Sequence, residues 1–162
     1  MKEILDKIGA YNLFNFLLPG ILFAVALERI TPYSITHKNL IIGAFIYYFA
    51  GLVISRFGSL IIEPFLKKVS FLQFTTYEDF ISASKSDPKL EQLSQDNNMY
   101  RTFVALFVLL ILAKGYEIVS AKLPILNEQI ATIAVVALLL GFLFSYRKQT
   151  NYITKRVNSK KS

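Results

Sequence analysis

Residues 129–146 form an uninterrupted apolar run, QIATIAVVALLLGFLFSY, with no charged side chain between Glu128 and Arg147. Two other uncharged runs have a similar length, twenty residues at 8–27 and seventeen at 39–55. A helix needs about 20 residues, at a rise of 1.5 Å each, to cross the hydrocarbon core of a bilayer. Each of the three runs therefore predicts a transmembrane helix.

A fourth apolar run, TFVALFVLLILA at residues 102–113, is shorter because Lys114 ends it. Taken alone, this run also fits a buried helix of a soluble protein. If Arg101 marks one interface, Lys114 lies about 20 Å further along the helix, and a lysine side chain can extend to the far headgroups. A fourth span would also bring the chain back across the membrane between the second and the last run. We therefore expect four transmembrane helices in one membrane domain, at about residues 12–30, 39–58, 99–119 and 129–147.

The composition excludes several classes of protein. The 162-residue chain is 54% hydrophobic and only 18% charged, whereas average globular chains carry about 25% charged residues. The chain has too few charged side chains to cover the surface of a small soluble domain. Its high apolar content excludes a disordered protein. Cysteine is absent, which excludes disulfides, thiolate metal sites and cysteine nucleophiles.

Basic residues predict the orientation of the spans. Fourteen of the eighteen Lys and Arg residues lie before the first run, between residues 56 and 101, or after residue 146. The positive-inside rule then places both termini on the cytoplasmic side of a bacterial inner membrane. Residues 59–98 become a cytosolic or interfacial helical connector, and residues 148–162 a basic cytosolic tail. The net charge of +7 then reflects topology and attraction to anionic lipid, which argues against direct nucleic-acid binding.

The N-terminal run also resembles a secretory signal peptide, with a small-x-small pattern, AVA, at residues 24–26. Acidic Glu3 and Asp6 and the length of the run argue against cleavage. We therefore expect an uncleaved first span that follows a short amphipathic lead at residues 4–8.

Two prolines interrupt apolar stretches. Pro19, followed by Gly20, removes a helical hydrogen bond to the carbonyl of Asn15. Its effect is either a kink within the first span or a helix that begins there, and the sequence leaves both open. Pro64 follows Glu63 beyond the second run and predicts a kink or restart in an interfacial helix.

The connector contains two helix-start signals. Thr76, with Asp79 three residues later, resembles a capping box, and Asp87 followed by proline is typical of an N-cap and N1 pair. The two asparagines at 97–98 predict a break before the third span. A connector of this size cannot hold its own core, so it must contact the bilayer, a second copy or a partner. Leu90 and Leu93 are its candidate partner-facing residues.

Small residues recur every four positions in the second and fourth predicted spans. Such ridges allow helices to approach closely in a membrane. They indicate either packing within the chain or a seam between copies of a homo-oligomer. The six candidate helix-packing residues are Gly51, Ser55, Ser59, Ala137, Gly141 and Ser145.

One set of ionisable residues lies near the outer end of the spans. Glu28 and Arg29 end the first span, while Lys114 and Glu117 are spaced to pair on one helix. Charges within a span indicate a functional site. These four lie near span ends, however, where they can also simply reach the interface.

Nothing in the sequence indicates catalysis. The lone His37 in a short loop is typical of a solvated residue rather than a metal ligand. No cluster of His or carboxylates, glycine-rich phosphate loop or nucleophile elbow is present. We expect no enzyme activity, no catalytic residue, no metal and no cofactor.

The stretches YNLFNFLLPG at residues 11–20 and NNMYR at residues 97–101 resemble small bacterial multi-pass membrane proteins found near phage-defence genes. The resemblance implies a membrane component of an antiviral defence system, and it transfers no functional residue.

Two functions fit these patterns. The first is a non-catalytic membrane subunit that anchors or senses, self-associates, and presents the connector to a cytosolic protein partner. The alternative is an oligomeric pore-forming or depolarising effector, with the outer polar set at its mouth.

Overall fold

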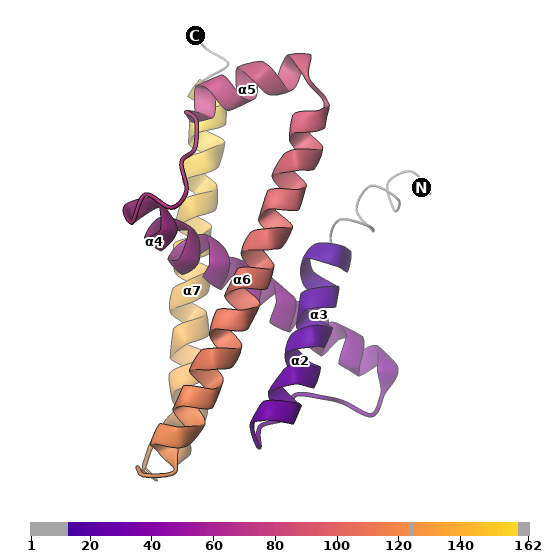
Figure 1. The fold of residues 1–162 in the computed structure, drawn as a ribbon, viewed down its shortest axis with the longest axis vertical. Helices are drawn as coiled ribbons and strands as arrows, with labels where there is room; N and C mark the ends of the chain where they lie inside the picture. The colour runs from indigo at the N-terminus through magenta and orange to yellow at the C-terminus, as the bar shows by residue number, and fades with distance from the viewer. Residues whose placement is uncertain (1–12, 124, 159–162) are drawn as a thin grey trace.

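The computed structural model describes residues 13–123 and 125–158, and every regular element in these ranges is a helix (Figure 1). The amphipathic lead at residues 4–8 and the last residues of the basic tail lie outside the described residues. The elements in chain order are η1 (Leu13–Leu17), α2 (Leu18–Ile30), α3 (Leu40–Phe57), η2 (Gly58–Ile62), α4 (Glu63–Lys68), α5 (Tyr77–Ser86), α6 (Lys89–Ser120) and α7 (Ile125–Asn158). The two η elements are π-helical turns.

Three helical stretches among the described residues are long and apolar enough to cross a membrane: Leu40–Lys68, Lys89–Ser120 and Glu128–Asn158. They correspond to the second, third and fourth predicted spans. The prediction of an all-helical fold is confirmed for the described part of the chain. The length and hydropathy of the three stretches suggest a membrane protein.

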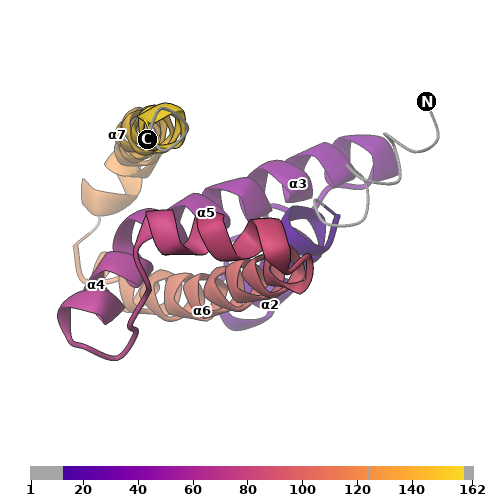
Figure 2. The ribbon, with the colours of Figure 1, turned by 90° about the horizontal axis from the view of Figure 1, so that it is seen from above.

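The helices alternate in direction. In Figure 1 the chain descends α2, returns obliquely through α3, descends α6 and rises through α7, with α5 at the upper end. Viewed from above (Figure 2), α3 runs across the picture while α7 is seen almost end-on. The first described residues of η1 and the end of α7 therefore point toward the same side of the molecule.

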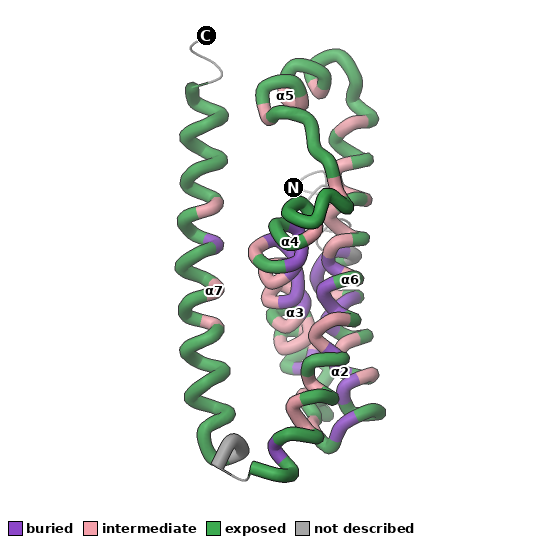
Figure 3. The backbone as a smooth tube through the Cα atoms, turned by 60° about the vertical axis from the view of Figure 1, so that its left-hand side comes forward, coloured by how far each residue is buried: buried purple, intermediate pink, exposed green. Residues whose placement is uncertain are grey.

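The apolar core lies where α2, α3 and α6 meet. Leu27, Ile54, Ala105, Leu106 and Leu110 are buried there together. Helix α7 lies largely outside this core and is exposed along most of its length (Figure 3). Of the most apolar part of this helix 6% is buried, whereas 22% is buried in each of the other two long stretches.

A close crossing of backbones joins α2 and η1 to α3. A Cβ atom added at Gly20 would lie 1.7 Å from the carbonyl oxygen of Tyr47, and one added at Gly51 would lie 1.7 Å from that of Phe16. Each glycine thus admits the backbone of the opposite helix, the kind of approach that only glycine allows.

Both prolines lie in continuous helix, two residues after a π-helical turn. Leu13–Leu17 precedes Pro19, and Gly58–Ile62 precedes Pro64. A widened turn is a known way to accommodate a residue that cannot donate the usual backbone hydrogen bond. The helix start considered at Pro19 is therefore wrong, because the helix is already formed from Leu13.

The helix start at Thr76 is confirmed, and the start at Asp87 is shifted by one residue, because α6 begins at Lys89 with Pro88 as its N-cap. The Thr76 hydroxyl accepts the Asp79 backbone N–H at 3.2 Å and donates to Asp79 Oδ2 at 2.7 Å, at the start of α5. The Asp87 carboxylate accepts the Lys89 N–H at 2.9 Å at the start of α6.

The predicted break at residues 97–98 is wrong, because α6 runs without interruption from Lys89 to Ser120. Asparagine disfavours a helix interior by only about 0.7 kcal/mol. That preference is too small to end a helix whose next turn, from Thr102 onward, is buried in the core.

Candidate functional site: one carboxylate among three cations

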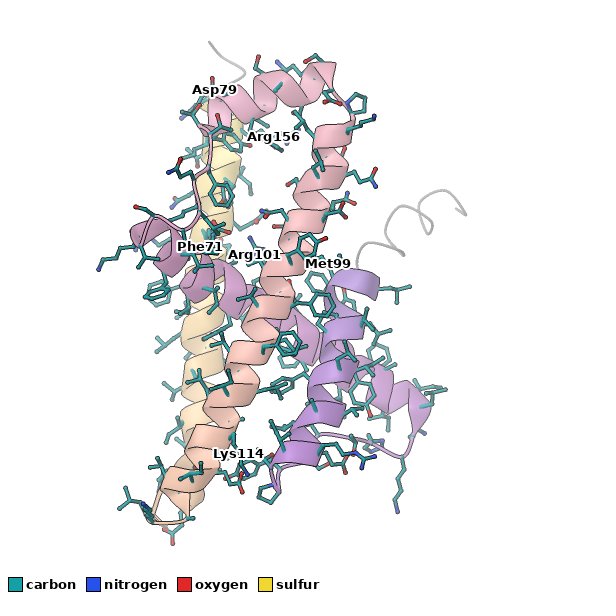
Figure 4. The ribbon with its side chains drawn as sticks, in the orientation of Figure 1. Phe71, Asp79, Met99, Arg101, Lys114 and Arg156 are labelled. Carbon is teal, nitrogen blue, oxygen red and sulfur yellow. The ribbon has the colours of Figure 1, made fainter. Side chains whose placement is uncertain are left out.

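Glu63 lies where α4 meets α6 and α7, and its side chain is only 10% exposed. Its Oε1 accepts a hydrogen bond from Lys67 Nζ at 3.0 Å, and its Oε2 accepts one from Arg101 Nη1 at 2.6 Å. Lys148 Nζ lies 3.8 Å from Oε1. Figure 4 shows Arg101 on α6, beside α4. One carboxylate thus links three helices; we call Glu63, Lys67, Arg101 and Lys148 the Glu63 cluster.

Lys148 also binds the backbone of η2. Its Nζ donates to the carbonyl oxygen and to the hydroxyl of Ser59, both at 2.7 Å. In the π-helical register the Glu63 N–H donates to the Gly58 carbonyl, so the Ser59 carbonyl would be served by residue 64. Residue 64 is a proline and has no N–H. Lys148 therefore supplies the donor that the helix lacks, as buried carbonyls require.

The Glu63 cluster carries more positive than negative charge. Three cations surround a single carboxylate, and Arg101 Nε is buried without a hydrogen-bond partner among the described residues. The Lys67 ammonium also lies 4.0 Å from the centre of the Phe74 ring, a cation–π contact. The cluster therefore contains more hydrogen-bond donors than acceptors.

A buried polar group lies one residue beyond Arg101. The hydroxyl of Thr102 lies 3.3 Å from both Asn15 Oδ1 and Ser55 Oγ, and it donates to the Asn98 carbonyl at 2.8 Å. Asn15, Ser55 and Thr102 are all almost fully buried. These contacts link η1, α3 and α6, and they fix the height at which Arg101 meets Glu63.

The structure does not bring the four outer ionisable residues into one cluster. Lys114 Nζ and Glu117 Oε2 form the expected local pair at 2.6 Å. Glu28 accepts a long hydrogen bond from Ser34 at 3.4 Å. The salt bridges of the described residues include neither Glu28 nor Arg29. The outer set is therefore one ion pair and two separate charges.

At the same end, the loop after α2 contacts the end of α6 through uncharged groups. The Tyr33 hydroxyl lies 3.3 Å from Ser120 Oγ, and the Tyr33 and Tyr116 rings are 6.0 Å apart. His37 is exposed in this loop, where its Nδ1 accepts the Asn39 N–H at 3.0 Å. No group of three metal-binding side chains occurs within residues 13–123 and 125–158.

The three candidate helix-packing residues of α3 and η2 each contact another element of the same chain. Gly51 lies against the Phe16 backbone, and the hydroxyls of Ser55 and Ser59 contact Thr102 and Lys148 respectively.

The small residues of α7 lie in more open surroundings. Ala137 is exposed, and a Cβ atom added at Gly141 would meet no other atom within 4 Å. Ser145 is buried, and its hydroxyl has no hydrogen-bond partner among the described residues. Near this ridge, Phe142 stacks on Phe49 of α3 with ring centroids 6.1 Å apart.

The two candidate partner-facing residues lie in the first turns of α6. Leu90 is half-buried and Leu93 is 59% exposed. The two neighbours therefore differ, and only Leu93 presents most of its side chain.

The Glu63 cluster was not predicted from the sequence. One signal was available: Glu63 is the only acidic residue between Glu28 and Glu78, and it follows a long apolar stretch. A carboxylate in such a place needs cationic partners. Those partners come from helices far away in sequence, so local patterns could not name them.

Comparisons with known proteins add no relative: no family model matches the chain, and neither a curated protein nor a solved structure matches it significantly.

Proposed function

We propose that the chain is a four-pass protein of the bacterial inner membrane, with both described ends on the cytoplasmic side. In this proposal it is a non-catalytic subunit that anchors or senses, and it presents residues 77–101 to a cytosolic protein. We call these residues, α5 and the part of α6 before Thr102, the docking hairpin.

The observation that carries the proposal is that the docking hairpin has no interior of its own. Helix α5 contains no buried residue, and the buried residues of α6 begin only at Thr102. Leu93 and Tyr100 are 59% and 65% exposed. Apolar side chains gathered on an exposed surface are typical of an interaction site.

The path of the chain supports four passes. Helix α6 runs opposite to α7, while α3 crosses α2 and returns obliquely toward the side where α4 lies (Figure 1). Twelve of the eighteen Lys and Arg residues lie between residues 56 and 101 or after residue 146, and α5 and the end of α7 lie at one end of the molecule (Figure 1). The positive-inside rule then favours the cytoplasm for this end.

A pull-down with an affinity tag tests the docking role. The full-length protein is crosslinked in cells, solubilised and purified, and the recovered cytosolic protein is quantified for the wild type and two variants. We expect Leu93→Asp to lower recovery at least about tenfold, because a buried charge would replace an apolar contact. The control, Gln92→Asp, adds the same charge at the neighbouring exposed position and should keep recovery near the wild-type level.

Two results would count against the proposal. Equal recovery with wild-type protein and Leu93→Asp would exclude docking through this surface. Release of the wild-type protein from membranes by alkaline carbonate would exclude an integral membrane protein.

A further inference from the structure

We propose that the Glu63 cluster binds the phosphate group of an anionic phospholipid. The inference rests on the proposed membrane location, and it adds a ligand and the residues that hold it.

Charge and hydrogen-bond donors provide the first argument. Lys67, Arg101 and Lys148 surround one carboxylate, so among the described residues the Glu63 cluster holds two more positive charges than negative ones. Arg101 Nε is itself buried, so the donor within reach of a ligand is Lys148, which has three N–H bonds, two of which serve Ser59. Phosphate oxygens accept strong, charge-assisted hydrogen bonds from such groups. A phosphate would therefore supply both a negative charge and an acceptor.

The depth of the cluster provides the second argument. Arg101 directly precedes the apolar run at 102–113, and Lys148 lies two residues beyond the run at 129–146. Lys67 lies near the end of the stretch Leu40–Lys68. All three cations thus lie at one boundary between apolar and polar sequence, the level at which lipid headgroups are found.

The exposure of the cluster provides the third argument. The side chains of Lys67, Lys148 and Arg101 are 42%, 27% and 20% exposed, so a headgroup can reach them. The apolar side chains of α7 next to this level, such as Leu139 and Leu143, are more than half exposed. They offer a surface for acyl chains, which favours a lipid over an acidic protein segment.

Thermal unfolding of the purified full-length protein in a neutral detergent tests the inference. Phosphatidylglycerol, phosphatidylcholine and inorganic phosphate are titrated separately. We expect phosphatidylglycerol to raise the unfolding temperature more than the other two. The apparent affinity should fall roughly tenfold, or about 1.4 kcal/mol, in Lys67→Gln and in Lys148→Gln.

Each variant has a matched control next to it in sequence. Lys68→Gln and Arg147→Gln remove the same charge from exposed positions outside the cluster, and both should bind phosphatidylglycerol almost as the wild type does. Lys148→Gln leaves the Ser59 carbonyl without its donor and can therefore impair folding. Lys67 is the most exposed of the three cations, and its loss leaves the Glu63–Arg101 pair intact. Lys67→Gln therefore tests lipid binding by the cluster even if Lys148→Gln fails to fold.

Three results would overturn the inference. Equal losses in a cluster variant and its control would mean general attraction to a charged surface. Equal stabilisation by inorganic phosphate would mean a free anion rather than a lipid. Unchanged lipid affinity, with loss of a co-purifying cytosolic protein, would assign the cluster to that partner. In each case retention of the protein in carbonate-washed membranes would leave the proposed membrane location standing.

Discussion

The ammonium group of Lys148 lies 2.7 Å from the backbone carbonyl oxygen of Ser59, a residue 89 positions earlier in the chain. The contact replaces the backbone hydrogen bond that Pro64 cannot donate in the π-helical turn. A proline in one helix thus creates the acceptor that holds a lysine of another. The same lysine lies beside Glu63, so the irregular turn positions the cation for the Glu63 cluster.

This relationship predicts a coupling between residues 64 and 148. In Pro64→Ala the new N–H can serve the Ser59 carbonyl, so Lys148→Gln should then destabilise the protein less than it does in the wild type. We expect a difference of about 1 kcal/mol, the net value of a typical hydrogen bond. Unfolding of the two single variants and the double variant in detergent gives this coupling, and strictly additive effects would contradict it.

The crossing of α2 with α3 predicts that neither glycine tolerates a methyl group. Gly20→Ala and Gly51→Ala should each lose about 3 kcal/mol or more of unfolding free energy, because the new Cβ meets a backbone carbonyl that cannot rotate away. Gly141→Ala is the control, since its Cβ meets nothing within 4 Å, and its better helix propensity should raise stability slightly. Wild-type unfolding temperatures for the first two variants would show that the helices do not cross here.

The buried contacts of Thr102 predict a loss of stability on removal of its hydroxyl. Thr102→Val should destabilise the protein by about 1–2 kcal/mol, because the Asn98 carbonyl loses its side-chain donor and the buried Ser55 hydroxyl loses an oxygen to which it can donate. Thr150→Val serves for comparison, since the Thr150 hydroxyl bonds only to its own helix and is exposed. Similar unfolding temperatures for the two variants would show that the buried contacts contribute nothing.

The N-cap of α5 predicts a local effect in the docking hairpin. Thr76→Ala removes the acceptor of the Asp79 N–H and should weaken the helix by about 1 kcal/mol. Amide hydrogen exchange should accelerate within α5 and stay unchanged in the buried part of α6. Thr75→Ala, which lacks the backbone contact, should have a smaller effect; equal acceleration by both would contradict the assignment of the cap.

Local features of this fold could be predicted because they depend on neighbouring residues. The Thr76 and Asp87 helix starts and the Lys114–Glu117 pair each involve residues within three positions of one another. The apolar helices follow from the length of the uncharged runs in the same way. Such features can be recognised from residues that lie close together in the sequence.

The remaining features depend on contacts distant in sequence. Glu63 pairs with Arg101 at a separation of 38 residues, and Thr102 meets Asn15 at 87. The asparagines at 97–98 suggested a break, but burial of the next turn of α6 outweighs their weak local preference. Pro19 suggested a kink or a helix start, and the structure places a π-helical turn directly before it.

Single-cysteine labelling tests directly whether the chain makes four passes with both described ends in the cytoplasm. The chain contains no cysteine, so each introduced cysteine is the only target. In intact cells a membrane-impermeant maleimide should label Lys38→Cys and Lys122→Cys, which lie in the two loops proposed to face outward. It should label Ser82→Cys in α5 and Asn151→Cys in α7 only after the cells are permeabilised. Labelling of Ser82→Cys in intact cells, or opposite behaviour of Lys38→Cys and Lys122→Cys, would contradict the account.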